Sequence, residues 1–451
     1  MNGYNNVNGS NESRTSGNGR YARNLFYLSL IEAGWGLGGA FVSPGAVLPL
    51  LLSAMGASLS TIGLLPGLGS LATTLPQLVA AHRTAGLARQ TPFVVRWHVL
   101  PTFAFLAVAA VAWRGGSGSL AVGLLYGALT LWYLGLGYVT PVWLAFAGRL
   151  AGPERRGHFF GVLSMAGLLG GVAGAWLCAL LLGLLPAPVS YAAGALVAFA
   201  AMNLANLGWF GVEEPAREPE ELAATASRRE PLPAYLRRLY ASVAGNSRFV
   251  RFLAAQQLVS LHSVLGAFYL VNAQRQFGAS PERVMALSGV AMAAQAVGSV
   301  LYAAVADRLG ALNTLAASQL LLLAAMGQAL SARSAEELTP VAILLGLFYG
   351  SYFNAKTTAV MELARGGDSA AYQAVNNLVM TPAAVLIPAA AGWATESYGY
   401  PAVLSTALAA TVAGTALLVA GHAPALLGGL RLAFGRLALV SRQLRLSATL
   451  W

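Results

Sequence analysis

Three ionisable side chains lie deep within apolar stretches of this sequence: Glu32, His262 and Lys356. A charge in an apolar environment is costly unless it has a partner or contact with water, so each of these residues needs an explanation. A carboxylate beside an ammonium group can take up and release a proton, or the ammonium can be taken over by a charged solute. The residue types therefore predict proton exchange or the binding of a charged small molecule.

Lys356 is distinctive because it is the only lysine among the 27 lysine and arginine residues of the chain. A desolvated lysine loses its proton far more readily than an arginine does. We expect Glu32 and Lys356 to form a coupling or binding pair. The alternative is a purely structural ion pair that holds two helices together.

Four further residues are candidates for the same site. His262 titrates near neutral pH and is a candidate proton carrier, while Gln256 offers neutral hydrogen bonds to a solute. Trp35 and Tyr133 are candidates for an aromatic lining. Each has a structural alternative, namely hydrogen bonds between helices for His262 and Gln256, and packing or interfacial anchoring for the two aromatic residues.

The elements that position these residues are predicted to be membrane-spanning helices. Of the 451 residues, 57% are hydrophobic and only 10% are charged, whereas soluble domains have about a quarter charged residues. A helix needs about 20 mostly apolar residues to cross the hydrocarbon core. Twelve such segments are predicted: Asn24–Leu52, Leu59–Ala81, Pro92–Trp113, Leu120–Ala147, Phe159–Leu185, Val189–Gly211, Phe249–Ala273, Val284–Ala306, Leu312–Leu330, Leu338–Ala364, Tyr372–Thr395 and Pro401–His422.

These segments give an all-α membrane protein of six spans, a charged linker and six spans. We predict a disordered tail over 1–22, a six-helix bundle over 23–211, a linker over 212–248, a second bundle over 249–422 and an amphipathic interfacial helix over 423–451. Arginines gather in alternate loops, and this asymmetry places both termini and the linker in the cytoplasm. The expected location is the cytoplasmic (inner) membrane, with membrane lipid as a partner.

Several function classes are disfavoured. Cys178 is the single cysteine, so neither a disulfide nor a cysteine-based metal site is expected. No glycine-rich phosphate loop or metal-ligand cluster is apparent, and we therefore predict no enzyme activity, no cofactor and no metal. The net charge of +11 stands mostly between apolar spans, which fits membrane topology rather than nucleic-acid binding. A monomer is expected.

Loop motifs point to a family. The loop after the eighth span reads Ala303-Ala-Val-Ala-Asp307-Arg308-Leu-Gly310, and the loop after the second, Ala81 to Arg89, keeps the basic residue Arg83 without an aspartate. With six plus six spans, this loop resembles the signature of the major facilitator superfamily. The resemblance implies that Asp307, Arg308 and Gly310, with Arg83, form a cytoplasmic gate. The alternative is a simple topology anchor.

The resemblance also implies that the first, fourth, seventh and tenth helices line a central cavity, which would include Glu32 and Lys356. At 1.5 Å per residue, Glu32 lies about 15 Å and Lys356 about 12 Å from the cytoplasmic side, so the two are at similar depth. We predict a secondary active transporter of a small organic solute, proton-coupled, working by alternating access. The alternatives are a uniporter or exchanger of the same fold, and a receptor or scaffold that transports nothing.

Overall fold

The structure is a computed structural model of the chain. It describes residues 5–84, 87–152, 155–215, 234, 237, 240–241, 243–364 and 369–422, and within these ranges it contains helices and no strands. Two compact units can be distinguished. Most of the predicted linker and the predicted interfacial helix over 423–451 lie outside the described residues.

The first unit comprises Met1–Ala57, Leu68–Arg229 and Pro281–Gly289. Its helices are α1 (Asn5–Ala40), α2 (Val47–Ala54), most of α3 (Leu59–Thr84), α4 (Thr91–Val99), the 3₁₀ turn η1 (Leu100–Phe103), α5 (Ala104–Trp113), α6 (Ser119–Ala151), α7 (Arg156–Leu184), α8 (Val189–Asn206) and η3 (Leu207–Gly211). α1 begins at Asn5, within the segment for which we predicted disorder, so residues 5–22 continue the first span as a helix. Pro101, which has no N–H to donate, lies in the 3₁₀ turn that separates α4 from α5.

The second unit comprises Ser58–Gly67, Glu230–Ser280 and Val290–Trp451. Its labelled elements are α11 (Ser247–Val259), η4 (Ser260–His262), α12 (Ser263–Phe277), most of α13 (Pro281–Leu309), α14 (Ala311–Ser331), η5 (Glu336–Leu338), α15 (Thr339–Leu363) and α16 (Ser369–Tyr398). A last helix covers Tyr400–His422. The predicted seventh span is thus interrupted by a 3₁₀ turn that ends at His262.

Ten helices of the described chain are long and apolar enough to cross a membrane, from Thr91–Trp113 to Tyr400–His422. They coincide with the third to twelfth predicted spans. The first and second predicted spans correspond to α1 and α3, which are not among the ten. The membrane-protein class is confirmed, and the total of twelve spans stays a prediction.

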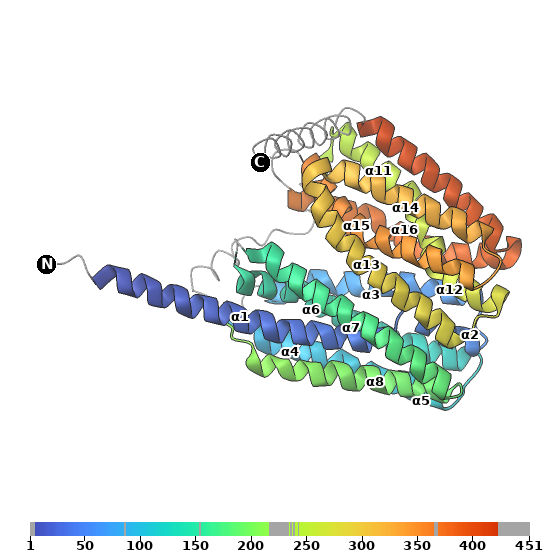
Figure 1. Cartoon of the computed structure of the whole chain (residues 1–451), viewed down its shortest axis with the longest axis horizontal. Helices are drawn as coiled ribbons and strands as arrows, with labels where there is room; N and C mark the ends of the chain where they lie inside the picture. The colour runs from blue at the N-terminus through green and yellow to red at the C-terminus, as the bar shows by residue number, and fades with distance from the viewer. Residues whose placement is uncertain are drawn as a thin grey trace, which may run out of the picture. The chain divides into compact units, whose positions relative to one another are not determined.

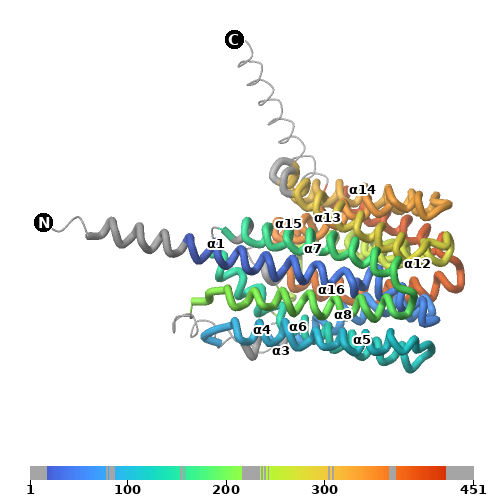
Figure 2. The backbone as a smooth tube through the Cα atoms, turned by 60° about the horizontal axis from the view of Figure 1, so that its bottom comes forward, coloured from blue at the N-terminus to red at the C-terminus, as the bar shows by residue number. Residues whose placement is uncertain are grey.

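Glycines bring α1 very close to α7. In both views α1 lies between α7 and α8 (Figure 1, Figure 2). A methyl group on Gly170 of α7 would overlap the carbonyl oxygen of Ala33 on α1, and one on Gly36 would overlap the carbonyl oxygen of Gly167. Small residues at a helix interface allow this close approach of the two backbones.

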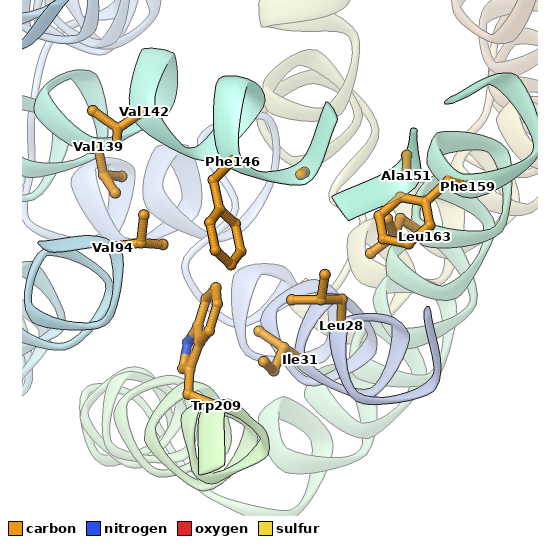
Figure 3. Close-up of a cluster of buried hydrophobic side chains, with 11 residues drawn as sticks. Leu28, Ile31, Val94, Val139, Val142, Phe146, Ala151, Phe159, Leu163 and Trp209 are labelled. Atoms are coloured by element: carbon orange, nitrogen blue, oxygen red, sulfur yellow. The ribbon is translucent and has the colours of Figure 1, made fainter. Parts of the chain in front are cut away.

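Large side chains fill the first unit at the end where the linker leaves it. Leu28 and Ile31 of α1 meet Phe146 of α6 and Trp209 of η3 (Figure 3). The remaining members of the cluster are Val94, Val139, Val142, Ala147, Ala151, Phe159 and Leu163. Dispersion contacts between such closely packed side chains add up to a large stabilisation, although each is small. This core holds α1, α4, α6, α7 and η3 in the positions that fix the residues described below.

Candidate functional site

Glu32 lies half-buried on α1, on the side that faces α7. A methyl group on Gly167 of α7 would lie 3.8 Å from its Oε2 atom, so the carboxylate rests against a helix surface without a side chain. None of the hydrogen bonds and ion pairs found for the described residues involves the Glu32 side chain. In its own unit, Glu32 is therefore a carboxylate without a polar partner.

Trp35, one turn along α1, belongs to an aromatic core inside the first unit. Its indole N–H donates to Oδ1 of Asn206 over 3.0 Å. Its ring stacks on Trp132 at a centroid distance of 5.6 Å and meets the edge of His98 at 4.9 Å. Since α8, α6 and α4 all contribute partners, this placement favours the packing interpretation of Trp35 over the cavity lining. Asn206, which sequence reasoning missed, also accepts from the Trp209 indole at 3.3 Å.

Tyr133 of α6 is half-buried against α3. Its ring carbons lie 3.3–3.5 Å from the position that a methyl group on Gly69 would take. The glycine therefore makes room for the tyrosine ring. This contact places Tyr133 between two helices of the first unit and leaves its role in solute binding as a proposal.

In the second unit, α11 and α15 bring two of the predicted residues to one tyrosine. The Tyr352 hydroxyl donates to Oε1 of Gln256 over 2.9 Å. The Lys356 Nζ atom lies 5.3 Å from the centre of the Tyr352 ring and 6.0 Å from that of Phe353, which are distances for a cation–π contact. Tyr352 was not predicted. The only signal for it in the sequence is its position one helical turn before Lys356.

His262 joins the same group of side chains. Its ring centre is 5.3–5.6 Å from those of Phe348, Tyr349 and Tyr352, and its Nδ1 atom is 3.5 Å from the Tyr349 hydroxyl oxygen. A methyl group on Gly266 would overlap that hydroxyl, so the glycine is needed for this arrangement. We call Gln256, His262, Tyr349, Tyr352 and Lys356 the Tyr352 cluster.

Glu214 forms a second polar site, where the linker leaves the first unit. Its carboxylate accepts from the backbone N–H groups of Gln90 and Thr91, both at 2.8 Å, and from the Thr91 hydroxyl at 2.7 Å. It also pairs with Arg149. Burial raises the pKa of Glu214, but the hydrogen bonds outweigh this effect and hold the pKa below its usual range. The carboxylate thereby caps the start of α4.

Glu213 points to another helix of the same unit. Its carboxylate pairs with Arg23 at 2.5 Å and with Arg20 at 3.7 Å, both on α1. Its backbone N–H donates to Oδ1 of Asn24 over 2.8 Å. The sequence places Glu213 and Glu214 in the linker without indicating partners for them. Glu213 pairs with a residue 190 positions away, and Glu214 accepts from one 124 positions away, so no local sequence pattern could reveal these contacts.

Of the predicted gate residues, Gly310 is the one whose surroundings the structure gives. It joins α13 to α14 with φ +81°, a conformation that favours glycine. Its carbonyl oxygen accepts from the Thr314 hydroxyl at 2.8 Å. Asp307 and Arg308 lie in the last turn of α13 and Arg83 in the last turn of α3, but their side chains are outside the described part of the chain.

No group of three or more histidine, cysteine or acidic side chains that could hold a metal ion is found among the described residues. Neither the Tyr352 cluster nor the Glu214 site combines a serine or cysteine nucleophile with a histidine base among its described side chains. The Tyr352 cluster provides hydrogen bonds, an ammonium group and aromatic faces. Glu32 provides a carboxylate. These groups are suited to binding a solute or a proton.

Comparison with known proteins gives results for sequence and for structure. A sequence model described as Major Facilitator Superfamily matches residues 249–446. Comparison with curated protein sequences gives no match.

Solved structures of transporters share the fold over most of the chain. A mutant of the nucleoside transporter NupG has a TM-score of 0.69 at 13% identity, covering 88% of this chain and 99% of that one. A POT family transporter in complex with 5-aminolevulinic acid has a TM-score of 0.64 at 13% identity, covering 90% and 96%. A bacterial homologue of the iron transporter ferroportin, in an inward-facing state, has a TM-score of 0.61 at 16% identity, covering 89% and 98%.

The sequence match covers the second half, and the structural likeness extends over nearly nine-tenths of the chain. Both agree with the family resemblance expected from the sequence, and the sequence match includes the loop at Asp307–Gly310. They support a multi-pass membrane protein with the fold of these transporters. Residues 249–446 are similar to the Major Facilitator Superfamily, and the likeness of fold extends over most of the chain.

Proposed function

We propose that the protein is a proton-coupled secondary transporter of a small organic solute, working by alternating access. The observation that carries the proposal is that two opposite charges, Glu32 on α1 and Lys356 on α15, each lack an ion-pair partner among the described residues of their own unit. The sequence predicts that the two residues lie at similar depth. Glu32 has no polar partner among the described residues of its own unit. Lys356 is in contact with aromatic rings and has no carboxylate at ion-pair distance among the described residues of its unit.

The energetic argument concerns the cost of an uncompensated charge. Breaking a buried ion pair so that one partner stays charged costs about 3–5 kcal/mol. If Glu32 and Lys356 pair across the central cavity, separation of the two bundles exposes each charge to that cost. A proton on Glu32, or a charged solute on Lys356, removes it. Occupancy then determines which conformations are accessible, as coupled transport requires.

Further assignments belong to this proposal. His262 relays the proton within the Tyr352 cluster, and Gln256 contributes a hydrogen bond to the solute. Asp307, Arg308 and Gly310, with Arg83, form the cytoplasmic gate. Both termini lie in the cytoplasm, the protein resides in the inner membrane with lipid around it, and it works as a monomer.

The test begins with a thermal-shift screen of solutes on the purified protein, repeated with Glu32→Gln and Lys356→Met. Solutes that stabilise the wild type are then followed as uptake into proteoliposomes under an imposed proton gradient, with and without a protonophore. We expect uptake to fall when the gradient collapses, and Glu32→Gln to abolish that dependence. Uptake that is indifferent to the gradient would establish a uniporter or exchanger instead.

A further inference from the structure

Two hydrogen-bond donors of the Tyr352 cluster are left without acceptors. Gln256 is completely buried, and its Nε2 atom has no hydrogen-bond partner. A buried donor that stays unsatisfied is unfavourable, and in native structures it calls for an explanation such as an absent ligand. The second donor is the Lys356 ammonium, whose contacts in this unit are the ring faces of Tyr352 and Phe353.

The orientation of the Gln256 amide is fixed by Tyr352. Because the Tyr352 hydroxyl donates to Oε1 over 2.9 Å, the amide oxygen is engaged, and the NH₂ group is the part of the amide left without a partner among the described residues. The same tyrosine ring carries Lys356 on its face. Tyr352 thus contacts an amide donor on α11 and an ammonium donor on α15, and the cluster offers donors where a ligand would need to bring acceptors.

The side chains next to Lys356 form a surface for the organic part of a ligand. Phe353 is 49% exposed and its ring stacks on that of Tyr349 at 5.7 Å. Asn354 and Thr357, on the same helix, are exposed too. Polar side chains on a membrane span are unfavourable against lipid, so this face of α15 is expected to meet water. A half-exposed aromatic ring beside an ammonium at a hydrated face is suited to an organic anion.

We propose that the solute is an organic anion whose carboxylate or other oxyanion binds the Lys356 ammonium and the Gln256 amide, with its carbon skeleton against Phe353. A cationic solute would meet the charge of Lys356 at short range, which disfavours it. This inference rests on the proposed transport function and deepens it. With Glu32 carrying the proton, one anion and one proton would move together, and the transported charge would cancel.

The test uses purified full-length protein and a panel of aliphatic and aromatic carboxylates, each accompanied by its neutral amide and its amine. We expect stabilisation by carboxylates only. Lys356→Met should weaken binding of the best carboxylate about tenfold or more, as expected for the loss of one charge-assisted hydrogen bond. Lys356→Arg should retain part of the affinity, and Gln256→Leu should weaken binding by less than Lys356→Met does.

Gln319→Leu is the matched control. Gln319 lies on α14 in the same unit, is completely buried, and has no hydrogen-bond partner on either amide atom. This variant should bind carboxylates like the wild type. Equal losses in Gln319→Leu and Gln256→Leu would show a general packing effect and overturn the assignment. So would stabilisation by amines or amides that Lys356→Met leaves unchanged, or a panel in which no carboxylate stabilises the folded protein.

This result is separable from the transport proposal. If anion binding depends on Lys356 but uptake ignores the proton gradient, the anion site stands and the coupling proposal fails. If proton-driven uptake is found for neutral or cationic solutes and survives Lys356→Met, the transport proposal stands and the anion site fails.

Discussion

Substitution of Glu214 by glutamine tests whether the linker carboxylate stabilises the first unit. The Glu214 side chain is 3% exposed and that of Arg149 is 20% exposed. Glu214→Gln keeps an acceptor for the α4 backbone but removes the charge, so Arg149 loses its partner and the hydrogen bonds from Gln90 and Thr91 lose their charge assistance. Removing one partner of a buried pair costs about 3–5 kcal/mol. The partial exposure of Arg149 places the expected loss near the lower end, about 3 kcal/mol.

The assay is thermal unfolding of the purified protein, followed by light scattering and intrinsic tryptophan fluorescence. A destabilisation of this size corresponds to a fall in Tm of about 6–12 °C for a unit of about 200 residues. Glu213→Gln is the control, because its carboxylate is 45% exposed and its arginine partners are about half exposed. Exposed pairs contribute about 0–1 kcal/mol. A Glu213→Gln variant that loses as much as Glu214→Gln would refute the reasoning.

The pH dependence of the same variants gives an independent measurement. Because the pKa of Glu214 is held below its usual range, the folded state favours the ionised form. This contribution to stability is present above the unfolded pKa, about 4.3, and is lost as the pH falls through the lower folded pKa. The difference in Tm between the wild type and Glu214→Gln should therefore be full at neutral pH and shrink below about pH 4. A difference that stays constant to pH 3 would contradict this account.

Two further predictions concern packing in the first unit. Gly170→Ala should destabilise the protein by about 1–3 kcal/mol, because the added methyl group meets the α1 backbone, which has no side chain to move aside. Gly161→Ala on the same helix, with nothing within 4 Å of the added group, should be neutral or slightly stabilising, and thermal unfolding of both variants checks the pair. Asn206→Leu should lower Tm and shift the tryptophan emission, since the indole N–H groups of Trp35 and Trp209 lose their acceptor at about 1–3 kcal/mol each. Unchanged emission would count against that network.

Much of the fold could be predicted because it depends on local composition. Spans such as Thr91–Trp113 and Tyr400–His422 were predicted within a few residues, since the length of an apolar run sets the length of a membrane helix. The beginning of α1 was not predicted, because residues 5–22 are polar and offer no apolar period to indicate a helix.

The surroundings of the candidate residues could be predicted only in part. Gln256, His262 and Lys356 were chosen for their chemistry and prove to share Tyr352 as a neighbour, but their meeting depends on how α11 packs on α15. Trp35 was a candidate for a cavity lining and instead faces α8, because an apolar helix has no polar side to indicate its orientation. Glu214 required knowledge of α4 and α6, far away in the chain.

The glycine contact between α1 and α7 has a mechanical consequence for Glu32. Where two helix backbones touch with no side chains between them, neither can rotate about its own axis without a steric clash. Gly36, Gly170 and Gly174 create such a contact next to Glu32, on the side towards the C-terminal end of α1. The Glu32 carboxylate is therefore carried by two closely packed helices that resist rotation, rather than by one helix that can turn on its own. Any displacement of α7 shifts Glu32 by the same amount.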